Sequence, residues 1–170
     1  MSRTAGIDVG STYTKAAVLD EAGALVGTGM VPTGFRLEQA AAAALAAALE
    51  AAGTDRDGLA YTATTGYGRN QIGFRDVQAT DLTAQSWGTR WFFPGTRTVL
   101  DIGGQTMKAM RLDDDRKVRS FRLNDKCAAG TGRGTLTSGA ASLAGREERF
   151  DRLPGDADTI KAYVRAFAGA

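Results

Sequence analysis

Two short segments of the chain carry an aspartate two residues before a glycine, each at the end of an apolar run. They are IDVGS, which contains Asp8, and LDIGGQ, which contains Asp101. A tight turn at such a glycine exposes backbone N–H groups that can bind an anion, and the missing Cβ lets a phosphate approach. The two carboxylates would repel a phosphate, but a hydrated Mg²⁺ between them removes that conflict. The pair of turns therefore predicts a site for Mg²⁺ and the phosphates of ATP.

The residues around both turns suit phosphate binding and hydrolysis. Candidate contacts of the first turn are Gly10, Ser11, Thr12 and Lys15, and those of the second are Gly103, Gly104, Gln105 and Lys108. Hydroxyl and backbone groups suit a β- or γ-phosphate, and a lysine adds a positive charge. Gln105 can orient an attacking water, so the candidate catalytic residues are Asp8, Asp101 and Gln105. Because the chain contains no histidine, catalysis would depend on carboxylates, lysine, thiol or metal.

The two turns belong to an internal repeat. Residues 7–20 and 100–113 match at a constant offset of 93, the separation of Asp8 and Asp101, with six identities in fourteen positions. Each copy predicts a strand, a glycine turn and a second strand, followed by an acidic turn and a third strand. One such turn alone is usually structural, but a repeated turn favours a paired phosphate site. The alternative is a duplicated fold whose turns have lost their ligand.

Helical segments alternate with these strands. The alanine-rich run 36–52 predicts a helix that stops at Gly53, and residues 58–65 predict a buried strand before the glycine-rich turn 65–69. A second helix is expected over 80–92, before Pro-Gly breaks the pattern. The aromatic residues of this helix and Phe93, which follows it, form a cluster: Trp87, Trp91, Phe92 and Phe93. Helical spacing favours core or inter-lobe packing for this cluster over a ligand platform.

These elements predict an α/β layered fold of two related lobes. The first lobe is expected over residues 1–95, and the start of the second over 96–134, including the second hairpin. Residues 135–170 show no sustained core periodicity until a helical pattern returns over 156–168. This last segment is interpreted as divergent, with a terminal helix.

Composition excludes several classes of protein. The chain has 170 residues, 43% of them hydrophobic, and a net charge of +2 with mixed signs, which gives no reason to expect nucleic acid or membrane partners. No signal peptide or membrane span is predicted, so a cytoplasmic protein is expected. The single cysteine, Cys127, rules out an internal disulfide. Three interpretations of Cys127 remain: a small buried apolar residue, a reactive thiol, or one arm of a site shared between chains.

Four strings resemble one family. They are GIDVGSTYTKAAVLD at 6–20, TTGYGR at 64–69, TVLDIGGQTMKA at 98–109 and NDKCAAGTGR at 124–133. In this order and spacing they resemble the activator ATPases of 2-hydroxyacyl-CoA dehydratases and benzoyl-CoA reductases, within the actin/Hsp70/sugar-kinase superfamily. The run 86–113 is most similar to an ATP-binding subunit of benzoyl-CoA reductase. The resemblance implies the superfamily's ribonuclease H-like fold (ASKHA), with the first lobe complete and the second truncated.

The resemblance also implies a function. In this family two subunits share one [4Fe-4S] cluster, and ATP hydrolysis drives transfer of a low-potential electron to a dehydratase or to the benzoyl-CoA reductase of anaerobic aromatic degradation. Cys127 matches a cluster ligand, and the start of a helix would stabilise its thiolate. A homodimer or a heterodimer with a sister ATPase subunit is expected, with the reductase or dehydratase catalytic subunits as partners.

The chain departs from the family pattern in two ways. Four thiolates normally hold such a cluster, but a homodimer of this chain would supply two. The glycine-rich segment that contacts adenosine in the family has no counterpart after residue 134, which is interpreted as a truncated, frameshifted or rearranged end. Whether the chain is an active ATPase is therefore left open. Its alternatives are a non-catalytic nucleotide-binding remnant, a partner subunit without a cluster, and, less favoured, a small-molecule kinase of the same superfamily.

Overall fold

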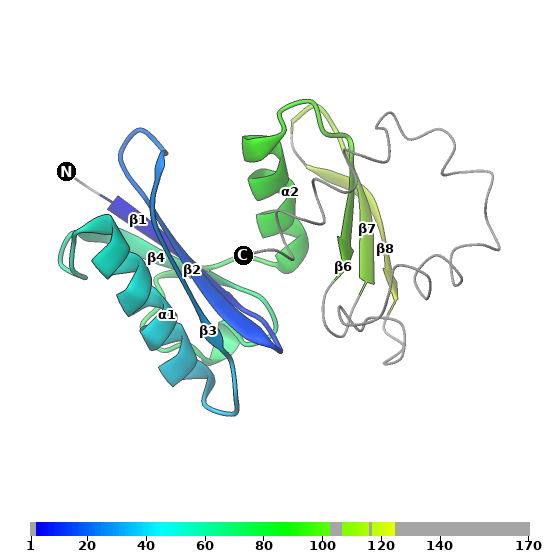
Figure 1. The fold of residues 1–170 in the computed structure, drawn as a ribbon. Helices are drawn as coiled ribbons and strands as arrows, with labels where there is room; N and C mark the ends of the chain where they lie inside the picture. Colours follow the sequence, from blue (N-terminus) through cyan, green and yellow to red (C-terminus); the bar gives the residue numbers. More distant parts are fainter. Residues whose placement is uncertain (1–2, 103–106, 116, 125–170) are drawn as a thin grey trace.

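The computed structural model describes residues 3–102, 107–115 and 117–124, which form two sheets and two α-helices (Figure 1). The first sheet has the strand order β3-β2-β1-β4-β5, and the second has the order β6-β7-β8. The first five strands are β1 (Arg3–Val9), β2 (Tyr13–Leu19), β3 (Leu25–Pro32), β4 (Leu59–Thr65) and β5 (Val77–Gln78). The others are β6 (Thr98–Ile102), β7 (Met107–Leu112) and β8 (Val118–Asn124). The helices are α1 (Leu37–Ala52), α2 (Asp81–Phe92) and a short 3₁₀ turn, η1 (Arg69–Gln71).

Helix α1 covers one face of the first sheet and closes its core. Strands β1, β2 and β3 form an antiparallel meander, and β4 adds to β1 in parallel. The helix packs directly on β3, at a distance that leaves no room for a side chain on Gly27 or Gly29. A Cβ on either glycine would come within 2.2 Å of a helix carbonyl oxygen. The alanines of α1 also allow this close approach, because their side chains add little bulk between helix and strand. The alanine-rich sequence and the two strand glycines are therefore complementary.

The internal repeat is confirmed in the strand register. Asp8 lies opposite Lys15 in the first hairpin, and Asp101 lies opposite Lys108 in the second, at the same offset of 93. The third strands also pair in equivalent registers, with matching irregularities at Val18/Leu19 and Arg111/Leu112. The two meanders are therefore structural copies, and equivalent sequence positions occupy equivalent places in them.

The acidic turns that precede the third strands are copies as well. The Asp20 carboxylate accepts a hydrogen bond from the Ala24 N–H at 2.8 Å, and the Asp113 carboxylate accepts one from the Lys117 N–H at 2.8 Å. A carboxylate that binds a backbone N–H shortly downstream is typical of aspartate in turns. The sequence-based prediction of an acidic turn is confirmed in both copies.

The helices cover opposite faces of the two copies. In the first copy α1 packs on the face that includes Ile7, whereas α2 reaches the second sheet through Leu82 and packs near Val99 and Met110. Successive strand residues point to opposite faces. At an offset of 93, Val99 corresponds to Gly6. Because Gly6 is the neighbour of Ile7 on the strand, Val99 lies on the face opposite to the one that α1 covers in the first copy. The second copy is therefore not a packing replica of the first within the described residues.

The predicted helices and strands are largely confirmed. Gly53 ends α1 in the left-handed conformation with φ of 61°, as its sequence position predicts. Strand β4 alternates between buried and more exposed residues instead of being buried throughout, and the short strand β5 was missed. No described helix has the length and apolar character needed to cross a membrane. The segment 135–170 and its expected terminal helix lie outside the described residues, so the domain boundaries stay predictions.

Candidate functional site

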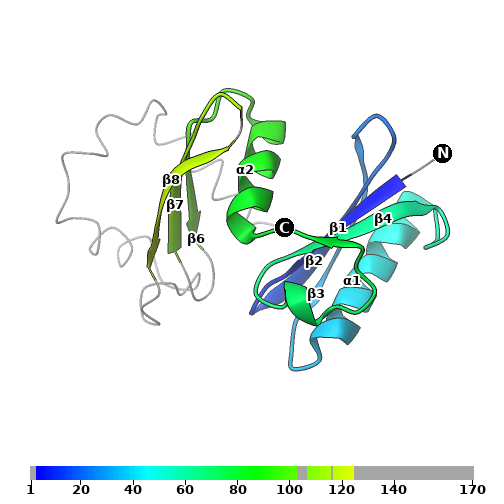
Figure 2. The same ribbon diagram turned by 180° about the vertical axis from the view of Figure 1, so that it is seen from behind.

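Asp8 and Asp101 lie next to the last residues of β1 and β6. These two strands run toward the same end of the molecule (Figures 1 and 2). Because antiparallel pairing places directly opposed side chains on one face, each aspartate meets its lysine. The Lys15 Nζ lies 3.9 Å from the Asp8 Oδ2, and the Lys108 Nζ lies 3.7 Å from the Asp101 Oδ2. Four of the predicted site residues are thus brought together as two matching pairs.

The charges of both hairpins act on Asp8. Partial burial raises the pKa of the Asp8 carboxyl, and the negative charges of Asp81 and Asp101 raise it further, while Lys15 and Lys108 lower it. The side chain still keeps 43% of its exposure to solvent. Carboxylates from β1, α2 and β6 therefore share one electrostatic environment, as a site for a cation–phosphate complex requires.

Asp81, the first residue of α2, is the acidic residue that the sequence analysis missed. Its Oδ2 accepts a hydrogen bond from the Lys108 Nζ at 2.5 Å, and its Oδ1 lies 3.7 Å from an Arg69 guanidinium nitrogen. Burial acts to raise the Asp81 pKa, but the hydrogen bond and charge of Lys108, the residue's own backbone N–H and Arg69 together lower it below its ordinary value. Asp81 therefore links the glycine turn of the first lobe to the second hairpin as an ionised group.

Gln85, one turn further along α2, is a second residue of the candidate site that the sequence analysis missed. Its Nε2 donates a hydrogen bond to the Asp101 Oδ2 at 2.6 Å. Within the described part of the chain, its Oε1 and the Thr65 Oγ1 are buried without a hydrogen-bond partner. Thr65 lies opposite Asp8 in the parallel pairing of β4 with β1. A buried side-chain oxygen without a partner among the described residues is thus found on the residue paired with Asp8 and on the residue hydrogen-bonded to Asp101.

The glycine-rich turn 65–69 closes over the end of β1. Gly66 has φ of +87°, and a Cβ there would come within 2.4 Å of the Asp8 Oδ1, so only glycine fits. The Gly68 N–H donates to the Val9 carbonyl at 3.0 Å, which holds the turn against the strand. The sequence analysis recognised this turn without assigning it to the site. The glycines of this turn were the sequence signal that could have assigned it to the site.

The remaining predicted site residues divide into two groups. Gly10, Ser11 and Thr12 form the first turn, where Ser11 and Thr12 are exposed and the Gly10 carbonyl accepts a hydrogen bond from Thr33 at 2.7 Å. The predicted residues Gly103, Gly104, Gln105 and Cys127 lie outside the described residues. Among the described residues, no group of three or more acidic, cysteine or histidine side chains is arranged to hold a metal ion.

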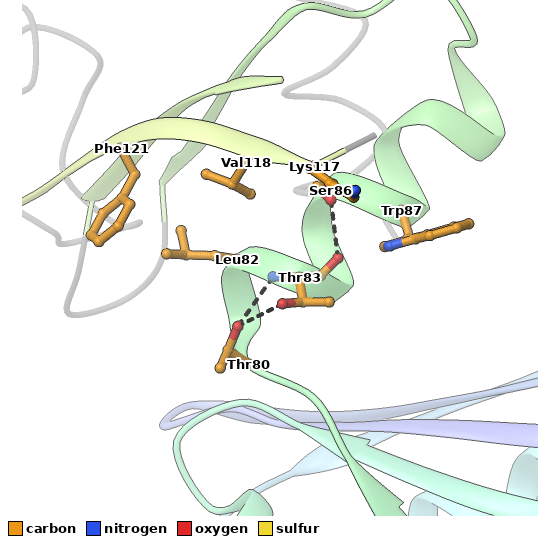
Figure 3. A pocket seen from close by; sticks show the side chains of 8 residues that line it. All are labelled: Thr80, Leu82, Thr83, Ser86, Trp87, Lys117, Val118 and Phe121. Atoms are coloured by element: carbon orange, nitrogen blue, oxygen red, sulfur yellow. Dashed lines mark hydrogen bonds between the residues drawn. The ribbon is translucent and has the colours of Figure 1, made fainter. Parts of the chain in front are cut away.

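A separate groove of about 340 Å³ lies between α2 and β8 (Figure 3). Its lining residues are Thr80, Leu82, Thr83, Ser86, Trp87, Lys117, Val118 and Phe121. None of them belongs to the predicted phosphate site. The expectation was core or inter-lobe packing for the aromatic cluster, and core packing is not found among the described residues: the four rings keep 39–57% exposure, while Ser86 and Thr89 form the buried face of α2. Inter-lobe packing stays a prediction. Helical spacing alone did not distinguish the two faces.

Solved structures show the class of fold. The chain resembles a ROK-family glucokinase of Streptomyces griseus, with a TM-score of 0.51 at 23% identity, over 76% of this chain and 50% of that one. Together with the paired hairpins, this likeness confirms the expected fold of the actin/Hsp70/sugar-kinase class.

The family follows from the sequence comparison. Residues 5–170 match the model described as the BadF/BadG/BcrA/BcrD ATPase family, and the chain belongs to that family. Relatives include the uncharacterized protein YjiL of Escherichia coli, 45% identical over 78% of this chain and 50% of that protein. The activator of lactoyl-CoA dehydratase of Anaerotignum propionicum is 41% identical over 76% of this chain and 50% of that protein. A benzoyl-CoA reductase subunit of Thauera aromatica is 31% identical over 78% of this chain and 48% of that protein.

Two solved structures of family members resemble the chain closely. Component A of the Acidaminococcus fermentans (R)-2-hydroxyglutaryl-CoA dehydratase has a TM-score of 0.73 at 37% identity, covering 78% of this chain and 51% of that one. The activator of 2-hydroxyisocaproyl-CoA dehydratase from Clostridium difficile, solved with bound ADPNP, has a TM-score of 0.71 at 34% identity, covering 77% and 48%. The chain thus spans about half the length of the curated relatives that it matches.

Proposed function

We propose that the chain binds Mg²⁺–ATP between its two hairpins, and that hydrolysis of this nucleotide is its contribution to activating a dehydratase or reductase. The observation that carries the proposal is the convergence of two matching Asp–Lys pairs, from β1/β2 and β6/β7, in one electrostatic environment. Membership of an ATPase family and likeness to an activator that binds ADPNP support it.

The described residues fit a hydrated magnesium ion. Mg²⁺ usually keeps several waters and binds proteins through one or two carboxylates together with substrate phosphates. Asp8 and Asp101 would supply the carboxylates, and waters of the ion could donate to the buried oxygens of Thr65 and Gln85 that have no partner among the described residues. The ion would neutralise charge on the phosphate oxygens during transfer.

The chain's own residues would bind and orient the nucleotide. The exposed Ser11 and Thr12 suit contacts with a β- or γ-phosphate, and Lys15, which is 49% exposed, can turn from Asp8 toward the phosphates. Gly103 and Gly104 would close on the terminal phosphate, and Gln105 would orient the attacking water. These roles for the second turn rest on its sequence and on its equivalence to the first.

Electron transfer is the finer part of the proposal. In it, Cys127 would be one ligand of a [4Fe-4S] cluster shared with a sister subunit, and such a cluster would supply low-potential electrons for a benzoyl-CoA reductase or a 2-hydroxyacyl-CoA dehydratase. Relatives described as a dehydratase activator and a benzoyl-CoA reductase subunit support the choice of partner, and the cluster role rests on the resemblance of the segment around Cys127. The donor set of this chain is insufficient by itself, because it contains one cysteine and four thiolates normally hold such a cluster. A heterodimer with a cysteine-richer ATPase subunit would supply the missing ligands.

ATP hydrolysis with and without Mg²⁺ tests the nucleotide proposal. We expect Mg²⁺-dependent phosphate release that Asp101→Asn lowers by roughly a hundredfold, the effect of losing one electrostatic stabiliser of the transition state. Asp57→Asn, which removes an exposed carboxylate elsewhere, is the matched control. Nucleotide binding without release would contradict the enzymatic proposal.

A nucleotide-binding subunit without its own cluster is the second candidate function, and the single cysteine favours it. Anaerobic reconstitution with iron and sulfide separates the two candidates. A cluster would give broad absorbance near ~400 nm that Cys127→Ala abolishes. A colourless protein, alone and with a sister subunit, would favour the second candidate.

A further inference from the structure

We propose that Asp81 is a positioning residue that takes the hydrogen bond of Lys108, so that Lys108 stays at ion-pair distance from Asp101 without hydrogen-bonding to it, and the Asp101 carboxylate remains available to the hydrated Mg²⁺ of the nucleotide. The inference rests on the proposed function and adds a residue to it. It assigns Asp81 no contact with the nucleotide or the ion, because its effect passes through Lys108.

The distances around Lys108 carry this inference. The Lys108 Nζ is hydrogen-bonded to the Asp81 Oδ2 at 2.5 Å, whereas the Asp101 Oδ2 lies 3.7 Å away, beyond hydrogen-bond range. Strand pairing nevertheless places Lys108 directly opposite Asp101. Without Asp81, the nearest anion for this ammonium group would be Asp101.

Burial makes Lys108 depend on such an anion. Its side chain is 12% exposed, whereas the equivalent Lys15 of the first hairpin is 49% exposed. Water can solvate Lys15 when it leaves Asp8, but a buried ammonium group without a partner is costly. The second hairpin therefore needs an additional carboxylate that the first hairpin does not need.

The neighbours of Asp81 and Asp101 fit these separate roles. Asp81 is held by Arg69 at 3.7 Å and by its place in the first turn of α2, where the helix dipole favours a negative charge. Asp101 receives its 2.6 Å hydrogen bond from the neutral amide of Gln85. An amide orients the carboxylate without neutralising it, so Asp101 keeps its charge for a cation.

A magnesium titration of fluorescent ATP-analogue binding tests the inference in four proteins: the unmodified chain, Asp81→Asn, Lys108→Met and the double variant. We expect Asp81→Asn to raise the Mg²⁺ concentration for half-saturation by roughly fivefold or more, the lower end of typical coupling between sites. Lys108 is itself a candidate phosphate contact, so Lys108→Met sets its own baseline; relative to that baseline, adding Asp81→Asn should have no effect, because the competing ammonium group is absent. A fifth protein, Asp81→Glu, keeps the negative charge and should match the unmodified value.

Each other outcome has a distinct meaning. An equal effect of Asp81→Asn in both backgrounds would overturn the inference, since Asp81 would then act without Lys108, and so would no effect in either background. If the unmodified chain binds no nucleotide with Mg²⁺, the proposed function itself fails. Thermal unfolding of each variant, with Asp57→Asn as a control for charge, shows whether the proteins are folded. If Asp81→Asn unfolds, Asp81→Ser and Lys108→Gln repeat the same comparison.

Discussion

At the scale of single residues, the site holds a carboxylate whose charged form is disfavoured. Partial burial and the charges of Asp81 and Asp101 raise the pKa of Asp8, so the folded chain binds a proton more tightly than the unfolded chain there. Stability from this group is therefore fully present below its ordinary pKa of 3.8 and is lost as pH rises through the folded value. At neutral pH the ionised Asp8 opposes folding. Such a cost is expected of a carboxylate that binds a cation, the role proposed here for Asp8.

Asp8→Asn should therefore stabilise the nucleotide-free chain at pH 7 while removing Mg²⁺-dependent nucleotide binding. The gain should be below about 1 kcal/mol, because solvent screens a half-exposed carboxylate. Urea unfolding at pH 7 and at pH 3 measures it, and the gain should vanish at pH 3, where Asp8 is protonated in both states. Loss of stability at pH 7 would show that the ion pair with Lys15 outweighs the burial cost.

At the scale of elements, the glycine turn and the first strand depend on each other. Gly66→Ala should destabilise the chain and weaken nucleotide binding, because the new Cβ would strain a φ of +87° and meet the Asp8 carboxylate. Gly53→Ala is the matched control, since Gly53 also has a positive φ but nothing lies within 4 Å of its Cβ position. We expect about 1 kcal/mol of backbone strain in the control and clearly more in Gly66→Ala. Equal losses in binding would contradict a role for the turn in the site.

The close packing of α1 on β3 is a second dependence between elements. Gly29→Ala places a Cβ 2.2 Å from the Ala44 carbonyl, whereas Gly6→Ala on β1 meets nothing within 4 Å. Denaturant unfolding should show a loss of about 3 kcal/mol for Gly29→Ala, the upper end for overpacking, because backbone must move. Gly6→Ala should be close to neutral. Similar values for both would show that the helix can shift away from the strand at little cost.

At the scale of the whole molecule, the Arg69–Asp81–Lys108 connection joins the two hairpin lobes through one carboxylate. A nucleotide bound to both hairpins should stabilise the chain as a unit. With Mg²⁺–ATP at a hundred times its dissociation constant, we expect about 2.7 kcal/mol of added stability. A rise of roughly 5–10 °C in the thermal midpoint would follow for a chain of this size. Chelation of Mg²⁺ or Asp101→Asn should abolish the shift, and a shift that survives both would place the nucleotide elsewhere.

Much of this architecture follows from the sequence because its signals are local. The glycine turns, the alanine run and the stop at Gly53 predict strands and helices through backbone preferences. The offset of 93 predicts the paired Asp8–Lys15 and Asp101–Lys108 positions, since a repeated sequence repeats its strand register. The family resemblance, which rests on such strings, is confirmed.

Only the tertiary structure brought Asp81 and Gln85 into the site. Nothing in DLTAQS marks them, because their role depends on where α2 places them relative to a strand at least 16 residues away. The same packing buries Ser86 and Thr89 and leaves the aromatic face of α2 largely exposed. Local propensity fixes which residues share a helix face. Which face is buried is decided by the sheet that the helix meets, and this depends on contacts distant in the chain.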